Sequence, residues 1–271
     1  MPTPLINVMN NAARKASRLL MRDFGEVEQL QVSRKGPGDF VSEADKRTEE
    51  ILHEELHKAR PGFGFLMEEG GTIDGENANE RWIIDPIDGT TNFLHGIPHF
   101  AISIGVERDK ELIAGMVYEP LRDDVFWAER NEGAYLNRRR LRVSERYDMG
   151  DALLATGIPF GTRPGKKAFT AMLNVVMSRT AGVRRQGSAA LDLAYVAAGR
   201  YEGFWETALA PWDMAGGIVI VREAGGLVGQ IDGRDNTLYG ESILAANQRL
   251  YDPLRKMLME AVQNEGLKLS D

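Results

Sequence analysis

The hydrophobic pattern of this 271-residue chain changes near Tyr147, and that change limits the folds the chain can adopt. Before this point, turn residues separate short β-type runs, which predict strands at 63–67, 82–84, 101–106, 113–118, 125–128 and 134–136. Two amphipathic helices precede these runs. One begins at Thr3-Pro4, and the other runs from a capping box at Ser42 to about Ala59. The first half therefore predicts an antiparallel sheet covered by two helices.

After Tyr147 strand-like and helix-like segments alternate. The predicted strands are 152–155, 183–185 and 203–205, and the predicted helices are 166–178, 188–198 and 214–223. One further strand and a helix beginning near Asn247 complete the chain. We therefore predict an α+β protein of layered sheets and helices. Its N-terminal half, residues 1–146, is helix and antiparallel sheet, and its C-terminal half, residues 147–271, is α/β.

Composition narrows the class of protein. The chain has no cysteine, which excludes disulfides and thiolate metal sites, and no apolar run of the roughly 20 residues that a membrane helix requires. Its first residues lack the basic-then-apolar order of a signal peptide, so we expect a soluble, cytoplasmic protein. The formal net charge of −7 argues against general nucleic-acid binding. An acidic protein that binds phosphate esters must reverse its field locally, and bound cations would do so.

Residues 82–93 carry the most chemical information. An apolar strand delivers Asp85 at its end, where Pro86 is expected to stop the sheet ladder, and Asp88 follows. The backbone N–H groups of residues 89–91 can then begin a helix and bind an anion. Two carboxylates beside such donors would bind hard cations and a phosphate at one place. Taken alone, the Asp-Pro and Asp-Gly pairs are also typical of a simple turn.

Further carboxylates stand at the ends of other apolar elements. Glu68-Glu69 ends the preceding strand, which would place Glu68 beside Asp85, while Asp213 lies in the first turn of a predicted helix. Asp45 is the fourth residue of the capping box. Each has an ordinary explanation: a solvated acidic loop, compensation of a helix dipole, and helix capping. These separate explanations do not account for the shared placement at element ends, which indicates a site.

These residues resemble the motifs of a known family. Residues 85–91, the pair Glu68-Glu69 and residues 212–217 resemble the three signature motifs of the inositol monophosphatase family, in the family's order and at similar separations. Residues 187–192, followed by 204–206, resemble its bacterial branch in particular. The resemblance extends over nearly the whole chain. It implies a layered αβαβα sandwich, with a Mg²⁺-dependent phosphatase site between the two halves.

The resemblance implies two to three Mg²⁺ ions held by carboxylates. Glu68 and Asp85, with the Ile87 carbonyl, would hold one ion, and Asp85, Asp88 and Asp213 would hold a second. Glu68 would help to hold a third, weaker ion. Such ions lower the pKa of a bound water and neutralise charge on phosphoryl oxygens. They would also resolve the conflict between an acidic protein and an anionic substrate.

The same resemblance assigns catalytic and substrate-binding positions. Asp45 and Thr90 match the pair that orients and activates the attacking water, and Glu68 completes the catalytic set. The backbone N–H groups of Gly89 and Thr90 would bind the phosphate, and Glu206 would accept hydrogen bonds from substrate hydroxyls. The implied substrate-binding residues are Lys35, Asp88, Gly89, Thr90, Gly187, Ala189, Glu206 and Asp213.

The expected function is hydrolysis of inositol 1-phosphate or a similar small polyol phosphate by metal-activated water. Relatives that share the metal motifs act on fructose 1,6-bisphosphate, 3′-phosphoadenosine phosphates or histidinol phosphate, so the same chemistry on these substrates stays open. A regulatory role with RNA or polymerase is another alternative, because some bacterial members are thought to have one. The resemblance also implies a homodimer and inhibition by lithium.

Other patterns compete with this interpretation. Residues 53–57 match the H-E-x-x-H zinc motif, but both histidines point roughly 140° away from the apolar stripe of their helix, which favours a solvated surface. The basic residues Arg138–Arg140 would suit nucleic acid, although alternation with Leu141 and Val143 favours a solvated hairpin. No nucleotide-binding glycine motif is present. His95 and His99 receive no role beyond loop packing.

Overall fold

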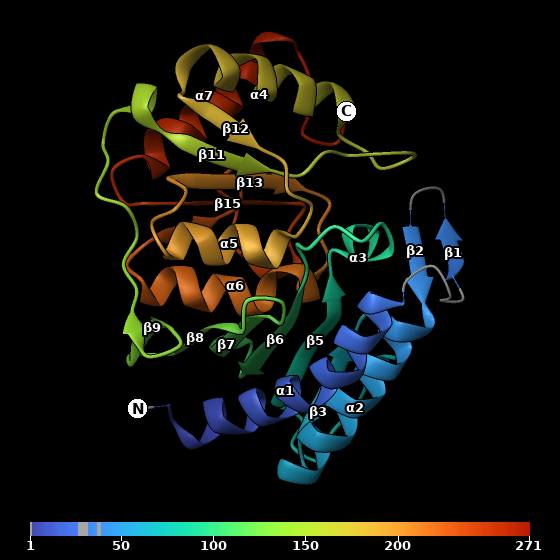
Figure 1. Ribbon diagram of the computed structural model, residues 1–271. Helices are drawn as coiled ribbons and strands as arrows, with labels where there is room; N and C mark the ends of the chain where they lie inside the picture. Colours follow the sequence, from blue (N-terminus) through green and yellow to red (C-terminus); the bar gives the residue numbers. More distant parts are fainter. Residues whose placement is uncertain (1, 27–31, 37–38) are drawn as a thin grey trace.

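The structure is a computed structural model that describes residues 2–26, 32–36 and 39–271, with side chains described for 2–26 and 43–271. Helical layers alternate with sheets (Figure 1). One outer layer holds α1 (Pro4–Gly25) and α2 (Glu43–Ala59), the middle layer holds α5 (Ala189–Ala197) and α6 (Pro211–Glu223), and the far layer holds α4 (Lys166–Arg179) and α7 (Tyr251–Asn264). One sheet lies on each side of the middle layer. The predicted αβαβα sandwich is therefore confirmed.

The larger sheet has eight strands in the order β10-β9-β8-β7-β6-β5-β3-β4. They are β3 (Gly64–Met67), β4 (Gly71–Ile73), β5 (Glu80–Asp88), β6 (Ala101–Arg108), β7 (Glu111–Glu119), β8 (Asp124–Glu129), β9 (Gly133–Leu136) and β10 (Arg139–Arg140). The pairing is antiparallel, as predicted, except that β3 runs parallel to β5. Because parallel strands end at the same edge, the turn after β3 lies beside the end of β5, with Met67 opposite Ile84.

Helices α1 and α2 cover one face of this sheet. Thr3 caps α1 by accepting a hydrogen bond from the backbone N–H of Ile6 (3.2 Å), and Pro4 occupies the first turn, as the sequence predicts. The apolar stripe of α1, which includes Met9 and Leu20, is buried together with Trp82 of the sheet. None of the helices in the described part of the chain is both long and apolar enough to span a bilayer.

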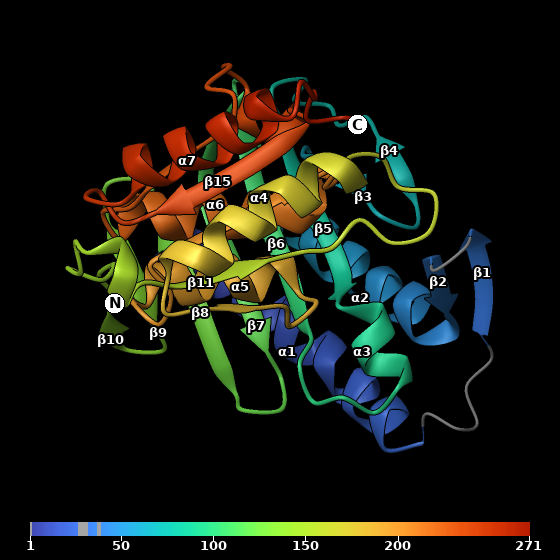
Figure 2. The same ribbon diagram turned by 90° about the horizontal axis from the view of Figure 1, so that it is seen from above.

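The smaller sheet has five strands in the order β12-β11-β13-β15-β14. They are β11 (Leu153–Thr156), β12 (Gly182–Arg184), β13 (Gly203–Thr207), β14 (Leu227–Gly229) and β15 (Ser242–Ala246). Strand β11 runs parallel to both β12 and β13, and β15 runs antiparallel to its two neighbours. Helices α4 and α7 lie side by side over its outer face (Figure 2). The alternation of strands and helices predicted after residue 147 is confirmed, except that two strands, β14 and β15, follow α6 where one was predicted.

Small residues bring α6 unusually close to the larger sheet. A Cβ atom on Gly115 of β7 would lie 2.3 Å from the Gly216 carbonyl oxygen, and one on Gly105 of β6 would lie 2.6 Å from the Ala215 Cβ. A side chain at either glycine would therefore push the helix away from the strands. This close approach fixes the position of Asp213, in the first turn of α6, relative to the sheet.

Some local predictions were wrong or incomplete. Strand β5 does not stop at Pro86 but continues to Asp88, with a register shift between Asp85 and Asp88. This bulge leaves an unpaired residue, so the missing N–H of proline costs no ladder hydrogen bond. Between the two predicted helices, where no strand was predicted, β1 (Val32–Gly36) and β2 (Asp39–Ser42) form an antiparallel pair. The solvated hairpin predicted at Arg138–Arg140 is present as the antiparallel pair of β9 and β10. No sequence signal indicated the short strand β4, or the 3₁₀ turns Met149–Asp151 and Thr237–Tyr239.

Candidate active site

A pocket of about 420 Å³ opens where residues of both halves of the chain meet. The sequence-predicted residues that line it are Glu68, Asp85, Ile87, Asp88, Gly89, Thr90, Gly187, Ala189, Glu206 and Asp213. Asp45 does not line the pocket, but its carboxylate lies against the Thr90 hydroxyl. Lys35 belongs to β1, and its side chain lies outside the described residues. The structure thus brings together residues that are up to 145 positions apart (213 − 68).

Three carboxylates converge at the floor of the pocket. One oxygen each from Asp85, Asp88 and Asp213 lies within 4.8 Å of the other two. Asp85 accepts a hydrogen bond from the backbone N–H of Ile87 (2.9 Å), and Asp213 accepts one from the backbone N–H of Ala210 (2.7 Å). These contacts orient two of the carboxylates and leave oxygen atoms directed at a common space.

The electrostatics of this cluster fit a cation. Burial, followed by the charges of Glu68, Asp88 and Asp213, raises the pKa of Asp85 well above its ordinary value. Burial and the charge of Asp213 raise the pKa of Asp88 to about 7. Crowded carboxylates of this kind are stabilised by a positive charge between them, and carboxylate and carbonyl oxygens are the ligands that hard divalent cations prefer. The residues present therefore fit Mg²⁺.

The C-terminal half of the chain holds Asp88 in place. The Ser188 hydroxyl and the backbone N–H groups of Ala189 (3.2 Å) and Ala190 (2.8 Å) donate to its carboxylate. The start of α5 thus orients a side chain that projects from β5. The next residue, Gly89, has φ of 100°, a backbone conformation that favours glycine. It precedes the short helix α3 (Thr90–Leu94).

Asp45 and Thr90 form a polar pair beside the carboxylate cluster. The Thr90 hydroxyl oxygen lies 3.1 Å from Asp45 Oδ1 and 3.0 Å from the Ile87 carbonyl oxygen. Its single proton can be donated to only one of these acceptors at a time. Asp45 is fully buried in the first turn of α2. The pair therefore couples a helix of the outer layer to the loop that bounds the pocket.

Glu206 forms the opposite wall, at the end of β13. Its carboxylate packs directly on Gly157, where an added Cβ atom would lie 1.9 Å from it. Burial, followed by the charges of Asp213 and Asp88, raises the pKa of Glu206 to about 8, although Arg163 and Arg185 act in the opposite direction. A carboxyl group placed here can form hydrogen bonds with hydroxyl groups of a molecule in the pocket.

The sequence interpretation assigned no role to several lining residues: Gly157, Phe160, Arg163, Arg185, Ser188, Asp192 and Leu209. A signal existed for two of them. Ser188 opens the predicted helix, where its hydroxyl is a natural cap, and Asp192 is a charged residue inside an otherwise apolar helix. Nothing in the pattern indicated Phe160 and Arg185, which meet in space with the guanidinium 4.9 Å from the ring centre.

The zinc-type motif on α2 forms no metal site. Among the described residues, the only group of three or more metal-ligating side chains that converges is Asp85, Asp88 and Asp213. His57 is exposed, as predicted, but His53 is partly buried against Phe65, with ring centres 4.5 Å apart. Burial also lowers the pKa of His53. The expectation that both histidines face solvent was therefore wrong for His53, because the aromatic ring of β3 covers it.

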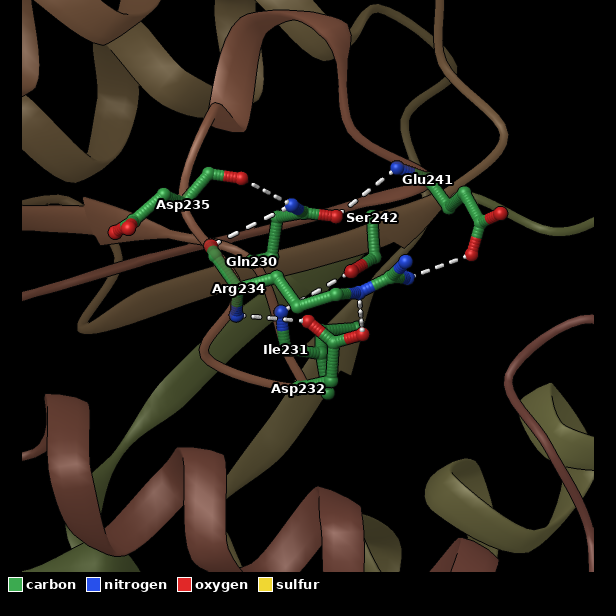
Figure 3. Close-up of polar contacts among 7 residues, drawn as sticks. All are labelled: Gln230, Ile231, Asp232, Arg234, Asp235, Glu241 and Ser242. Carbon is green, nitrogen blue, oxygen red and sulfur yellow. Dashed lines mark hydrogen bonds and ion pairs between the residues drawn. The ribbon is translucent and has the colours of Figure 1, made fainter.

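A larger pocket of about 640 Å³ lies over the loop between β14 and β15. Among the described residues, it contains no converging group of three or more metal-ligating side chains. Arg234 of this loop pairs with Asp232 (2.5 Å) and Glu241 (2.7 Å), and the Gln230 side chain bridges the Asp235 carbonyl and the Glu241 N–H (Figure 3). These charges and hydrogen bonds satisfy one another. The cluster is explained by the loop structure, and the carboxylate pocket is the better candidate site.

The fold and the site together define a class of protein: layered α+β proteins with a buried carboxylate cluster in a pocket formed by both halves of the chain. Residues 1–267 match the inositol monophosphatase family, and the chain belongs to that family. The inositol-1-monophosphatase of Mesorhizobium japonicum is 52% identical over 259 residues, which cover 96% of each chain.

Two further relatives carry a different name. The Nus factor SuhB of Pseudomonas aeruginosa is 44% identical over 255 residues, covering 93% of this chain and 94% of that one. The crystal structure of the extragenic suppressor protein suhB from Bartonella henselae has a TM-score of 0.92 and 52% identity, covering 94% of this chain and 98% of that one. Both the phosphatase and the Nus factor names thus occur among similar proteins.

Proposed function

We propose that this protein is a Mg²⁺-dependent phosphomonoesterase that hydrolyses inositol 1-phosphate or a similar small polyol phosphate. The observation that carries this proposal is the convergence of Asp85, Asp88 and Asp213 beside a pocket lined with further polar groups. The name of the Mesorhizobium relative supports the same substrate. Both halves of the chain, 1–146 and 147–271, contribute to the proposed site.

The proposed metal ligands are Glu68, Asp85, the Ile87 carbonyl, Asp88 and Asp213, for two to three ions. When bound, such cations supply Lewis-acid catalysis of phosphoryl transfer and lower the pKa of water. The protein contributes the orientation of the carboxylates through the bulge of β5 and the first turns of α5 and α6. It also keeps them at a distance at which they repel one another unless a cation is present.

The proposed catalytic pair is Asp45 and Thr90, together with Glu68. Because the Thr90 hydroxyl contacts Asp45, it can donate its proton to that carboxylate and accept a hydrogen bond from the attacking water. Such a water would then direct a lone pair at phosphorus. The backbone N–H groups of Gly89 and Thr90 would bind the phosphoryl oxygens, which are the groups that gain charge in an in-line displacement.

The proposed polyol-binding residues are Gly187, Ala189 and Glu206, with Asp88 and Asp213 shared between substrate and metal. Gly187 and Ala189 flank the cap of α5, and Glu206 faces them from β13. Lys35 is proposed as a further substrate-binding residue near the metal site. A wall with both backbone and carboxyl groups suits a small molecule rich in hydroxyls.

A substrate panel tests the proposal. Metal-stripped protein is assayed for phosphate release with and without millimolar Mg²⁺ on inositol 1-phosphate, fructose 1,6-bisphosphate, 3′-phosphoadenosine 5′-phosphate and histidinol phosphate. We expect Mg²⁺-dependent turnover that is fastest with inositol 1-phosphate. A different leading substrate would keep the chemistry and change the substrate. No turnover on any of them by folded protein would contradict the enzymatic function.

A regulatory role in association with RNA or polymerase is the second candidate, favoured by the Nus factor name of the Pseudomonas relative. The exposed arginines Arg138, Arg139 and Arg140 at the edge strand β10 offer a basic surface for it. Salt-sensitive RNA binding that is lost in the triple glutamine variant would support this role. RNA binding that is unchanged in that variant would show that the β9–β10 hairpin has no part in this role.

Three further expectations complete the proposal: a cytoplasmic protein, expected from the composition, and a homodimer and inhibition by lithium, implied by the family resemblance. Lithium is expected to act through the proposed metal site and should therefore compete with Mg²⁺ in the phosphate-release assay. Light scattering on the purified protein would establish the oligomeric state, and a mass of about 30.1 kDa would exclude the dimer.

A further inference from the structure

Asp192 is a buried carboxylate that no part of the proposed mechanism uses. It lies in the first turn of α5, is 1% exposed, and lines the pocket. Its Oδ1 atom is inaccessible to solvent and has no hydrogen-bond partner. Neither of its oxygens forms a hydrogen bond or an ion pair with any residue in the described part of the chain. A carboxylate in this situation lacks the partner that burial requires.

The neighbours of Asp192 do not supply that partner. Burial, followed by the charges of Glu206 and Asp88, raises the pKa of Asp192, so the groups beside it are other carboxylates. The charge of Arg185 acts in the opposite direction, but its guanidinium lies over the Phe160 ring and forms no ion pair with Asp192. Asp192 is also absent from the three carboxylates whose oxygens converge within 4.8 Å. The missing partner is therefore a hydrogen-bond donor in the pocket.

Glu119, another buried carboxylate beside α5, has the contacts expected of a structural role. Glu119 is fully buried, lies 3.3 Å from Arg122, and accepts a hydrogen bond from the Tyr195 hydroxyl of α5 (3.2 Å). A buried carboxylate with such partners can contribute to stability, whereas one without them is destabilising. Asp192 thus lowers the stability of the fold unless a ligand supplies its missing hydrogen-bond partner.

We propose that Asp192 is a specificity-determining residue that accepts a hydrogen bond from a substrate hydroxyl, next to the hydroxyl contact made by Glu206. Two neighbouring carboxyl acceptors in one pocket select a phosphate ester whose alcohol carries at least two hydroxyls, as a cyclic polyol does. This inference rests on the proposed phosphatase function. It adds a role for a residue to which the family resemblance assigned none.

The test compares Asp192→Ala and Asp192→Asn with the wild type on two substrates at saturating Mg²⁺. Inositol 1-phosphate carries the hydroxyls, and 4-nitrophenyl phosphate carries none. We expect kcat/KM of the alanine variant to fall at least about tenfold on inositol 1-phosphate, mainly through KM, and to stay within about twofold on 4-nitrophenyl phosphate. The asparagine variant, which keeps an acceptor oxygen, should lie between the alanine variant and the wild type.

A stability measurement separates binding from structure. Because Asp192 has no partner, the metal-free alanine variant should unfold at the same temperature as the wild type or a higher one. Glu119→Gln is the matched control: it weakens a paired buried carboxylate outside the pocket, and should lower the unfolding temperature without changing substrate preference. The Mg²⁺ concentration for half-maximal activity should be the same in all variants.

Three results would overturn the inference. Equal losses on both substrates would make Asp192 a structural or general catalytic residue. A large increase in the Mg²⁺ requirement of Asp192→Ala would make it a cation ligand. Unchanged kinetics on inositol 1-phosphate would leave it without a role in the pocket. If the wild type hydrolyses neither substrate, the proposed function fails instead, and calorimetric binding of inositol 1-phosphate to wild type and Asp192→Ala then decides the inference: equal affinity would contradict it.

Discussion

Two groups of buried carboxylates in this protein differ in what surrounds them. Glu202 is fully buried, accepts a hydrogen bond from the backbone N–H of Leu153 (2.7 Å) and pairs with Arg146 (2.9 Å). Asp85 and Asp88 are also buried, and burial, followed by the charges of neighbouring carboxylates, raises their pKa values. Glu202 binds structural partners from both halves of the chain, Arg146 and Leu153, whereas Asp85 and Asp88 face a pocket.

This difference distinguishes buried carboxylates that have a structural role from those that have a functional role. Removing one partner of a paired buried carboxylate destabilises the folded state, because the other partner is left without its compensating contact. A crowded one destabilises the folded state until a ligand compensates it, so it persists only where function requires it. The same reasoning places Asp192 and Glu206 with the functional group. Substitutions in the two groups should therefore have opposite effects on stability and activity.

The largest expected effect is that of Asp88→Asn. It removes a charge from the proposed metal site while leaving the backbone donors of α5 near the side chain. We expect the rate of phosphate release to fall about a thousandfold or more, because metal-assisted phosphoryl transfer depends on this charge. The unfolding temperature without Mg²⁺ should be unchanged or higher. Wild-type turnover at saturating Mg²⁺ would show that the metal assignment is wrong.

Glu202→Ala should produce the reverse pattern. Removing this carboxylate leaves the Leu153 N–H without its acceptor and breaks the ion pair with Arg146, whose side chain is largely exposed. We expect the free energy of unfolding, measured in urea, to fall by about 1–3 kcal/mol, mainly because a buried N–H loses its hydrogen bond. Activity measured well below the unfolding temperature should be within about twofold of the wild type. A large loss of activity with little loss of stability would contradict the structural role of Glu202 and its separation from the carboxylates of the pocket.

His99 makes the stability of the folded state depend on pH, separately from the buried carboxylates. Burial, with a smaller contribution from Arg122, lowers the pKa of His99 from 6.5 to about 4. The neutral form is therefore favoured on folding, and this stability is present above pH 6.5 and lost as the pH falls toward 4. By linkage the loss at pH 5 is about 2 kcal/mol. His99→Gln should be less acid-sensitive than the wild type by this amount in urea unfolding at pH 7.5 and 5, and equal sensitivity would contradict the shift.

Glu206→Gln should give the smallest effect. Glutamine keeps an acceptor oxygen but loses the charge, so hydrogen bonds to hydroxyls should weaken without loss of the pocket shape. We expect kcat/KM to fall about tenfold more on inositol 1-phosphate than on 4-nitrophenyl phosphate. Arg184→Gln, at an exposed residue that does not line the pocket, is the control. Equal losses on both substrates would remove Glu206 from the polyol-binding wall.

Much of the fold could be predicted from the sequence because its elements have strong local signals. The capped helix α1 and the strands of the larger sheet follow from periodicity and turn residues. The parallel pairing of β3 with β5 and the bulge after Asp85 could not be predicted, because both depend on partners distant in the chain. The short strand β4 could not be predicted for the same reason.

The site was predictable only where its residues are grouped along the chain. Asp85 and Asp88 lie in one segment, and the motifs of Glu68 and Asp213 each stand at the end of an apolar element. Asp192 was not identified, since a charged residue in a helix is ordinary until burial shows that it has no partner. The roles of the residues in the pocket stay predictions.

The most direct test of the central claim is the effect of Mg²⁺ on thermal unfolding of the metal-stripped protein. If the crowded carboxylates form a cation site, a ligand that binds only the folded state must stabilise it, by about 2.7 kcal/mol at a hundred times its Kd. The account predicts an unfolding temperature that rises with Mg²⁺ in the wild type and in Glu202→Gln, and that does not respond in Asp88→Asn. A wild-type unfolding temperature that is the same with and without millimolar Mg²⁺ would contradict it.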